Sequence, residues 1–258
     1  MISCYLQGGL GNQMFQISAT YALGLENNDR CCFDFDACNT PLQGNTSIKY
    51  KDNVLSKVCN SKVFPSVVYH EPNFSYDKIP YKENSILVGY FQSEKYFKNY
   101  ENEIRDLFKC DEDIKKIIFE KYPQLNNEKT CSIHVRRGDY IKFNDHHEVQ
   151  SIDYYKNALS YFDNDTHFLI FSDDINWCKN NFDFLENKTY CEGNEDFEDL
   201  YIMSFCKNNI MANSSFSWWG AWLNENINKT VISPKKWFGV KKSDFNLSDL
   251  YFEKTILL

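Results

Sequence analysis

The stretch CSIHVRRGDY at residues 131–140 gives the strongest indication of the fold. Its first part, Ser132 to Val135, alternates and is rich in β-branched residues, which is typical of a strand. Arg136 and Arg137 follow, and then glycine and aspartate, which are poor strand formers. In an open α/β sheet, ligands bind at the carboxyl ends of strands, where paired guanidinium groups can each hold two phosphate oxygens. We therefore expect a phosphate-binding clamp at this point.

The composition is typical of a globular protein with a large core. The chain has 258 residues, of which 43% are hydrophobic and 17% aromatic, and this length suits one large or two small α/β domains. The formal net charge of −8 argues against nucleic acid or an anionic membrane as the main partner, because neither would meet an extended basic surface. An anionic small ligand would need a local basic pocket.

Ten cysteines could indicate disulfides, but we expect reduced thiols in a cytoplasmic protein. Met1 leads directly into the first expected strand, so we expect no secretory signal and no integral membrane span. The cysteines form no C-x-x-C pair and no spacing with histidine that is typical of metal sites. Cys4, Cys131 and Cys206 lie in apolar runs and should pack as small hydrophobic side chains.

The first half of the chain predicts strands that alternate with helices. A strand over 2–6 is followed by a glycine turn and then by a helix with one apolar face. In this turn Gly9, Gly11 and Asn12 are candidate ligand contacts, because glycines let backbone approach a ligand and the helix start has free N–H groups. The alternative is a turn that only connects a strand to a helix.

A second strand is expected over 31–36, and it ends in Asp34 and Asp36. This D-x-D spacing is like that of metal-dependent sugar-nucleotide transferases. We favour a role in ending the strand, because aspartate commonly does so and a loop with asparagine and proline follows directly. Residues 37–82 are poorly periodic and predict loops and helical turns, with a strand-like run at 67–70.

A domain boundary is expected near 123, because a helix over 111–122 ends before Pro123 and a polar stretch follows. We therefore expect one Rossmann-like domain over 1–122 and a second over 123–258. The first would also hold a strand over 85–91 and a helix over 94–109.

Two more polar groups follow expected strands in the second half. A strand over 167–172 ends in Asp173 and Asp174, which could contact a base or ribose or cap the next helix, whereas metal binding is less favoured. A short strand over 209–212 precedes a tryptophan-rich helix whose start offers hydroxyl and amide groups for a second anion site, or only caps. These residues are Asn213, Ser214, Ser215 and Ser217.

Five motifs occur together in one order: GGLGNQMFQ at 8–16, GYFQSEKYF at 89–97, HVRRGDY at 134–140, FSDD at 171–174 and NSSFSWWGAWL at 213–223. Together they closely resemble the bacterial-type α-1,2-fucosyltransferases of glycosyltransferase family 11. The resemblance implies an α/β fold of GT-B type, with two facing Rossmann-like domains, a central cleft, and the second domain binding the donor. It also implies inverting transfer of L-fucose from GDP-β-L-fucose to the 2-hydroxyl of a galactoside, without a metal ion or other cofactor.

Roles for individual residues follow from this resemblance. The block from His134 to Arg137 would hold the GDP diphosphate, and Arg136 and Arg137 would neutralise the departing β-phosphate. Asp139 is the first candidate for the base that deprotonates the acceptor hydroxyl, and the alternative is an ion pair with a neighbouring arginine. His134 should contact the nucleotide or pack at the strand end. Asp173 or Asp174 could accept hydrogen bonds from guanine.

Three other functions have some support in the sequence. Asp34 and Asp36 could serve a metal-dependent glycosyltransferase. Residues 137–139 spell the Arg-Gly-Asp tripeptide of adhesion proteins, although it directly follows a strand that we expect to be buried. The third is a sugar-nucleotide sensor without catalysis. The acceptor glycan stays open, because acceptor specificity usually resides in variable loops, and the sequence indicates no oligomeric state.

Overall fold

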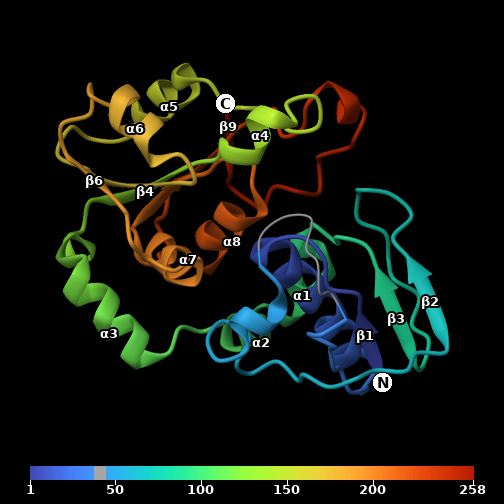
Figure 1. Cartoon of the computed structure of the whole chain (residues 1–258). Helices are drawn as coiled ribbons and strands as arrows, with labels where there is room; N and C mark the ends of the chain where they lie inside the picture. Colours follow the sequence, from blue (N-terminus) through green and yellow to red (C-terminus); the bar gives the residue numbers. More distant parts are fainter. Residues whose placement is uncertain (38–44) are drawn as a thin grey trace. The chain divides into compact units, whose positions relative to one another are not determined.

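The computed structural model describes residues 1–37 and 45–258, which form two compact units. Unit 1 comprises Met1–Cys110 and Phe245–Phe252, and unit 2 comprises Asp111–Asp244 and Glu253–Leu258. The chain in Figure 1 thus leaves unit 1, builds most of unit 2, and then contributes a short return segment to unit 1.

The division comes earlier than the expected boundary between 122 and 123, because helix α3 (Glu112–Lys121) packs on unit 2. The Phe119 ring of α3 lies 5.3 Å from the Phe205 ring of helix α7 (Asp196–Phe205). The helix that seemed to close the first domain therefore belongs to the second one.

Unit 1 contains a parallel sheet of three strands in the order β1-β3-β2. The strands are β1 (Ile2–Cys4), β2 (Val67–His70) and β3 (Ser85–Val88). Helix α1 (Leu10–Glu26) follows β1 and packs against it, and its sequence is buried over most of its length. The remaining elements are short: α2 (Glu101–Leu107) and the 3₁₀ turns η1 (Ser47–Tyr50), η2 (Glu94–Tyr96) and η3 (Lys98–Tyr100).

Two sequence expectations for unit 1 are wrong. The strand expected over 31–36 forms only isolated bridges, at Cys31 and Phe33. The helix expected over 94–109 is divided into η2, η3 and α2, because Phe97 is fully buried and its backbone is not helical, with φ −134°. The strand-like run at 67–70 is confirmed as β2. Part of the expected loop region, residues 38–44, lies outside the described residues.

The expectation that all thiols are reduced is also wrong, because the structure joins Cys32 to Cys59 by a disulfide. The disulfide joins a residue that follows α1 to one that follows η1. Cys4, Cys131 and Cys206 are free and buried, and their packing as small hydrophobic side chains is confirmed.

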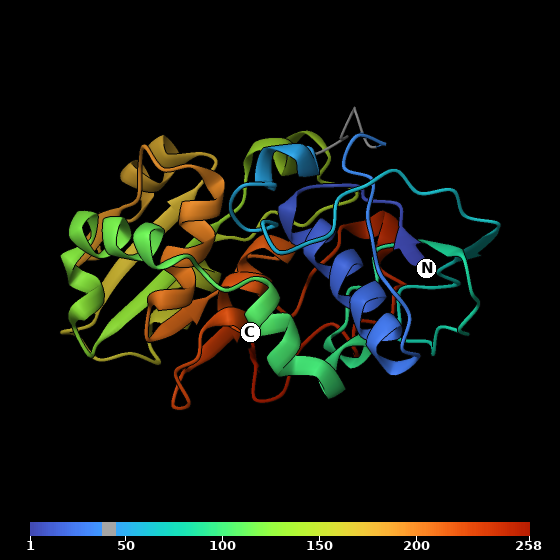
Figure 2. The same ribbon diagram turned by 90° about the horizontal axis from the view of Figure 1, so that it is seen from below.

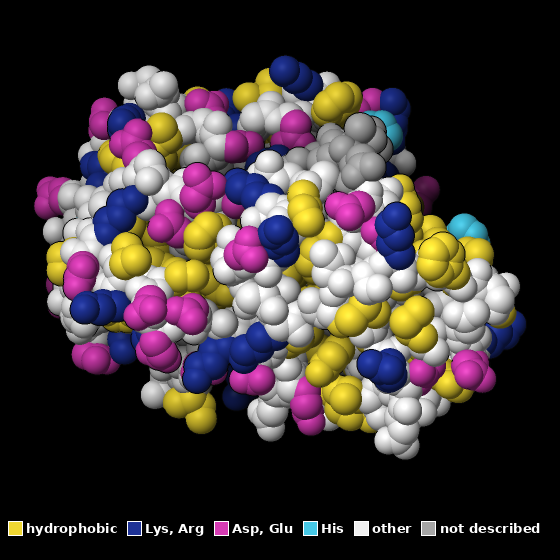
Figure 3. All heavy atoms as spheres, turned by 60° about the horizontal axis from the view of Figure 1, so that its bottom comes forward, with side chains coloured by type: hydrophobic (Ala, Val, Ile, Leu, Met, Phe, Trp, Pro, Cys, Tyr) yellow, Lys and Arg dark blue, Asp and Glu magenta, His cyan; other side chains and the backbone are white. Residues whose placement is uncertain are grey.

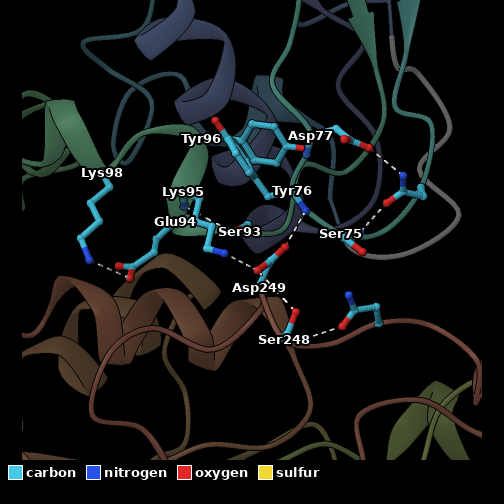
Figure 4. A network of polar contacts seen from close by, with 12 residues as sticks. Ser75, Tyr76, Asp77, Ser93, Glu94, Lys95, Tyr96, Lys98, Ser248 and Asp249 are labelled. Atoms are coloured by element: carbon cyan, nitrogen blue, oxygen red, sulfur yellow. Dashed lines mark hydrogen bonds and ion pairs between the residues drawn. The ribbon is translucent and has the colours of Figure 1, made fainter.

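The return segment of unit 1 is anchored by the network in Figure 4. The Asp249 carboxylate accepts hydrogen bonds from the Lys95 ammonium and, at 3.0 Å, from the Tyr76 N–H. Leu250 is buried, and the Phe245 ring stacks on the Phe74 ring at 5.5 Å. A segment distant in sequence thereby completes the core of unit 1.

Unit 2 contains a parallel sheet of six strands in the order β6-β5-β4-β7-β8-β9. The strands are β4 (Thr130–Val135), β5 (His167–Ser172), β6 (Lys188–Tyr190), β7 (Asn208–Ile210), β8 (Val231–Ser233) and β9 (Ile256–Leu257). Strands β4, β5 and β6 extend the sheet in one direction, and β7, β8 and β9 extend it in the other. This is the strand order of the dinucleotide-binding Rossmann fold.

Helices cover both faces of this sheet, as Figures 1 and 2 show. On one face, α5 (Ile152–Leu159) and α6 (Ile175–Asn181) pack with alternate residues of β4 in one hydrophobic core. On the other face, α7 packs against α8 (Ser215–Leu223), and Asn209 of β7 links Ser132 of β4 to α7. A short helix, α4 (Gly138–Lys142), follows β4 directly.

The face of the molecule shown in Figure 3 carries charges of both signs. On the face shown in Figure 3, lysine and arginine side chains are interspersed with aspartates and glutamates. Among the described residues, no helix combines the length and the apolar character that crossing a membrane requires.

Candidate functional site

The candidate site of unit 2 lies where the strand order reverses, between β4 and β7. Because the chain leaves these two strands in opposite directions, their carboxyl ends open a crevice where ligands bind in such sheets. The Tyr140 hydroxyl of α4 donates a hydrogen bond of 2.9 Å to the backbone oxygen of Asn213. The residues that follow β4 and those that precede α8 are thus brought together, as the sequence predicted.

The two arginines are held by carboxylates. Arg136 Nη2 lies 2.7 Å from Asp139 Oδ1, and its Nη1 lies 3.1 Å from Asp173 Oδ2. Arg137 Nε lies 3.2 Å from Asp174 Oδ2. Both side chains are largely buried, with 30% and 17% of their surface exposed. Their guanidinium groups are therefore fixed in place before any ligand binds.

Asp173 and Asp174 both accept hydrogen bonds from backbone N–H groups of the protein. Asp173 Oδ1 accepts the Arg137 backbone N–H at 2.9 Å, and Asp174 caps α6 by accepting the Trp177 N–H at 3.2 Å. A Cβ atom at Gly138 would lie 2.6 Å from Asp173 Oδ2, so a larger residue there would displace this carboxylate from its place beside Arg136. The predicted cap is confirmed for Asp174, whereas a contact from either carboxylate to guanine stays a prediction.

Asp139 forms the ion pair with Arg136 that the sequence offered as the alternative to a catalytic base. The contact joins the first turn of α4 to the residue that directly follows β4. A carboxylate in this position restricts the guanidinium of Arg136 and balances its charge. The structure therefore supports an orienting role for Asp139, and its role as a base stays a prediction.

His134 has the properties of a buried ligand-binding group. Its side chain is 5% exposed, lies on the α8 face of β4 and approaches the Phe216 ring at 5.7 Å. Its Nδ1 atom has no hydrogen-bond partner among the described residues. Burial, with a smaller contribution from Arg136, lowers the pKa of His134 to about 3, so the imidazole is neutral at physiological pH. A neutral ring that never gains a proton there is poorly suited to be a general base.

At the serine-rich start of α8, some side chains already form hydrogen bonds that hold the fold. Asn213 is buried, and its amide donates to the backbone oxygens of Glu148 at 2.9 Å and Trp237 at 2.7 Å. The Ser217 hydroxyl donates to the backbone oxygen of Ala212 at 3.3 Å. Asn213 and Ser217 thus already serve the fold, and ligand contacts from either side chain stay predictions.

Ser214 caps α8 by accepting the Phe216 N–H at 3.3 Å. Ser214 and Ser215 remain candidates, because the first N–H groups of the helix are oriented to meet an anion. These groups and His134 stand at the same strand ends as the arginines. The arrangement can hold a phosphorylated ligand through fixed cations and N–H donors together.

The glycine turn of unit 1 has a backbone geometry that requires glycine at position 8. Gly8 has φ +75°, and a Cβ atom there would lie 2.4 Å from Asn12 Nδ2. Gly9 is the N-cap of α1, followed within its first turn by Gly11 and Asn12. The Asn12 Oδ1 atom accepts a hydrogen bond of 2.6 Å from Gln92 Nε2. Ligand contacts from this turn stay predictions.

Asp34 closes a local turn, because its Oδ1 atom accepts the backbone N–H groups of Asp36 at 3.0 Å and Ala37 at 3.1 Å. This is the turn-forming behaviour that the sequence favoured over metal binding.

Comparison with known proteins assigns the chain to a family. The sequence model described as Glycosyl transferase family 11 matches residues 1–249. The chain belongs to glycosyltransferase family 11. The Escherichia coli O-antigen biosynthesis glycosyltransferase WbnK is 32% identical, covering 96% of this chain and 98% of that protein. An alpha-1,2-colitosyltransferase of Escherichia coli is 30% identical, covering 97% and 96%.

The fold of this family 11 transferase also has solved counterparts. The crystal structure of the fucosyltransferase NodZ from Bradyrhizobium matches with a TM-score of 0.58 at 11% identity, covering 85% of this chain and 90% of that one. NodZ has also been co-crystallised with GDP. The expected α/β fold of GT-B type is confirmed.

Sequence reasoning missed several residues that shape the site of this transferase. The Trp177 ring lies 3.9 Å from the Arg137 guanidinium carbon, and Tyr140 lies beside Arg136 at 5.5 Å. Both aromatic residues fall within the first turn of a helix that follows a charged strand end, which is a usable signal for a stacked arginine. Gln13 and Gln16 are buried in α1 and hold the glycine turn. Buried glutamines in a helix of this hydrophobicity signal a polar contact.

Proposed function

We propose that this family 11 transferase moves L-fucose from GDP-β-L-fucose to the 2-hydroxyl of a galactose-terminated glycan, with inversion at the anomeric carbon. The observation that carries the proposal is the pair Arg136 and Arg137, fixed by carboxylates at the strand-order reversal of a Rossmann-type sheet. That position is where such sheets bind nucleotides. The position of the pair supports the second unit as the donor-binding domain and the first as the acceptor-side domain.

The chemical need of the reaction is to stabilise the GDP that departs. Its β-phosphate gains negative charge as the bond to the sugar breaks, and prepositioned donors lower that barrier most when they need no reorganisation. Arg136 and Arg137 supply the cations, the start of α8 supplies N–H groups, and His134 offers one uncharged ring nitrogen. We assign the charge-stabilising role to the two arginines.

The two cations also support the proposal that no metal ion or other cofactor takes part. A divalent cation would do for the diphosphate what paired guanidinium groups can do. Asp34, the first aspartate of the D-x-D spacing, is engaged in a turn. Activity should therefore persist in excess EDTA.

The proposed reaction also requires a base that removes the proton from the acceptor hydroxyl. Asp139 remains the candidate base, although its ion pair with Arg136 supports the orienting role more directly. Cytoplasmic location and the identity of the acceptor glycan remain proposals as well.

A second donor sugar is favoured by one comparison, the alpha-1,2-colitosyltransferase that is 30% identical over nearly the whole chain. Colitose is fucose without its 3-hydroxyl, so a GDP-linked donor of either sugar would present the same diphosphate to the arginines. The two proposals therefore share the nucleotide site and differ only in how the sugar is recognised.

Calorimetry with GDP, UDP and ADP in EDTA tests the nucleotide site. We expect GDP to bind and the other two nucleotides to bind more weakly, because only guanine combines an N1–H with an exocyclic amino group for carboxylate acceptors. Turnover of GDP-fucose and of GDP-colitose with lactose then distinguishes the sugars. Equal binding of all three nucleotides, or binding only after Mn²⁺ is added, would contradict the proposal.

A further inference from the structure

Glu71 links the ends of two neighbouring strands in unit 1. It directly follows β2, and its backbone N–H donates to Val88 O at the end of β3 at 2.9 Å. Its side chain reaches beyond that strand. Glu71 Oε2 accepts the Tyr90 N–H at 2.6 Å, and Oε1 accepts the Phe91 N–H at 3.0 Å. One carboxylate thus binds two consecutive backbone N–H groups.

The backbone that Glu71 holds is strained. Phe91 has φ +52°, a left-handed conformation that is costly for an aromatic residue. Its ring is fully buried and packs edge-on against Tyr96 at 5.4 Å. At Gly89, an added Cβ atom would lie 2.4 Å from the Cβ atom of Glu71. Strain of this kind persists only where surrounding contacts hold it, and the charge-assisted hydrogen bonds from Glu71 supply such contacts.

The turn from Gly89 to Gln92 connects Glu71 to the glycine turn that precedes α1. The Gly89 carbonyl accepts a hydrogen bond of 3.1 Å from Gln16 Nε2 of α1. The next contact along the turn is Gln92 Nε2, which donates to Asn12 Oδ1 at 2.6 Å. This bond fixes the Asn12 amide with its oxygen toward Gln92, so its Nδ2 group is the donor that remains for a ligand oxygen.

We infer that Glu71 is a positioning residue, which holds the turn at residues 89–92 and through Gln92 sets the Asn12 amide for a substrate oxygen on the acceptor side. The inference rests on the proposed function, in which Asn12 contacts substrate. It adds a residue that the sequence motifs do not include, because Glu71 lies outside all five of them.

The chemistry requires a carboxylate at this position. A glutamine would offer one acceptor oxygen and would turn its NH₂ group toward the other backbone N–H, where two donors would meet. Four titratable groups lie close enough for the charge of Glu71 to act on them: Tyr69 of β2, Cys4 of β1, Tyr96 of η2 and Tyr90 of the turn. Burial, with a smaller contribution from Glu71, raises the pKa of each of them. All four are therefore uncharged at neutral pH, so none of them places a second negative charge beside the carboxylate.

Glu71→Gln is the decisive variant, with Glu83→Gln, an exposed glutamate of the same unit, as the matched control. In E71Q we expect amide hydrogens of residues 90–92 to exchange roughly tenfold faster, because one hydrogen bond to a charged group is lost. The KM for lactose should rise by a similar factor while kcat changes less. GDP affinity should match that of E83Q, because the nucleotide site is built from unit 2.

The pH profile separates positioning from a simple loss of stability. Burial raises the pKa of Glu71 above its ordinary value of 4.5, so the KM for lactose should rise as the pH falls toward that raised pKa. This rise in KM at low pH should be absent in E71Q, because its side chain does not titrate. Gln92→Ala should raise the same KM without changing exchange at Tyr90 and Phe91, and it serves as the test if E71Q does not fold.

Exchange and KM values in E71Q equal to those of E83Q would overturn the inference, as would an unchanged KM in Q92A. Failure of the proposed function is distinguishable from this result. It would show as absent GDP binding in the wild-type protein, whereas the exchange measurement reports on the turn without any substrate.

Discussion

Arg136 and Arg137 are neighbours in sequence but have different surroundings. Arg136 bridges two carboxylates, those of Asp139 and Asp173, whereas Arg137 lies on the face of Trp177 and contacts Asp174. Both positive charges are therefore balanced inside the protein. A diphosphate must compete with these carboxylates for the guanidinium groups, so net affinity will be smaller than two free arginines would give.

Replacing either arginine by alanine should lower kcat roughly a hundred- to thousandfold, because each variant lacks one fixed cation opposite the departing phosphate. Single-turnover rates with GDP-fucose and lactose measure the effect. Arg30→Ala, at an exposed position of unit 1, should retain the wild-type rate. A rate for R136A or R137A within a few fold of R30A would exclude the clamp.

The position of the arginine pair was predictable because it depends on a local rule. A β-branched run that ends in charged residues fixes both the strand and its functional end. The partners of the arginines were harder to predict, because Asp173 follows another strand, β5, and its contact depends on the pairing of β4 with β5. The structural role of Asn213 was not predictable either, because its amide holds backbone from two segments that are distant in sequence.

Among the helices, α7 has a carboxylate with a shifted pKa, that of Asp199, near its first turn. The capping box of Glu195 and Glu198 begins the helix, and one position later the Asp199 carboxylate accepts a hydrogen bond of 2.7 Å from Asn194 Nδ2. Burial raises the pKa of Asp199 from 3.8 to about 7, although this hydrogen bond opposes the shift. The side chain is partly buried beside the loop that precedes α7, to which Asn194 belongs.

Stability should therefore fall as the pH rises from about 4 to about 7, because the folded protein retains a proton on Asp199 that the unfolded chain has lost. Asp199→Asn removes this titration and should flatten the dependence. It should also make the protein more stable than wild type at pH 8, since an amide oxygen can still accept from Asn194. Urea unfolding at pH 4.5, 6 and 8 measures it.

The control for this variant is Asp244→Asn, at an exposed site, which should follow the wild-type pH dependence. Parallel pH curves for D199N and the wild type would show that Asp199 titrates normally in the folded protein.

Elements were predictable where one periodic pattern dominated. In unit 2 the central strands β4 and β5 and the helices α5 and α7 follow their sequence patterns, because these strands are buried and the helices cover the faces of the sheet. The edge strands β6 and β9 are less buried and were not predicted. The helix expected over 94–109 failed because tertiary burial of Phe97 outweighed local helical periodicity. The sequence also did not allow us to predict to which unit α3 belongs, because the helix against which it packs, α7, is distant in sequence.

For the whole molecule, the path of the chain is the distinctive feature. Residues 245–252 return to unit 1, and residues 253–258 then complete unit 2 as β9 and its flanks. Composition and periodicity gave no sign of this path, because the return segment has little secondary structure and its role depends on distant contacts.

Leu250→Ala tests the return segment. Leu250 is 1% exposed, and truncating a buried leucine costs about 3 kcal/mol of folding free energy. We expect a loss of this size in urea unfolding, with faster amide exchange concentrated in unit 1. Leu257→Ala is the matched control, because Leu257 lies in the same tail but is 40% exposed. Similar losses in both variants would show that the tail does not anchor unit 1.

The return segment also limits how the enzyme can be recombined. A chimera that exchanges everything after residue 110 would bring in eight residues, 245–252, that belong to the other unit. Their side chains would then face a foreign surface in place of Lys95, Tyr76 and Phe74. A workable exchange would transfer residues 111–244 together with 253–258 and retain the recipient's own intervening segment, so unit 2 is not encoded by one continuous stretch of gene.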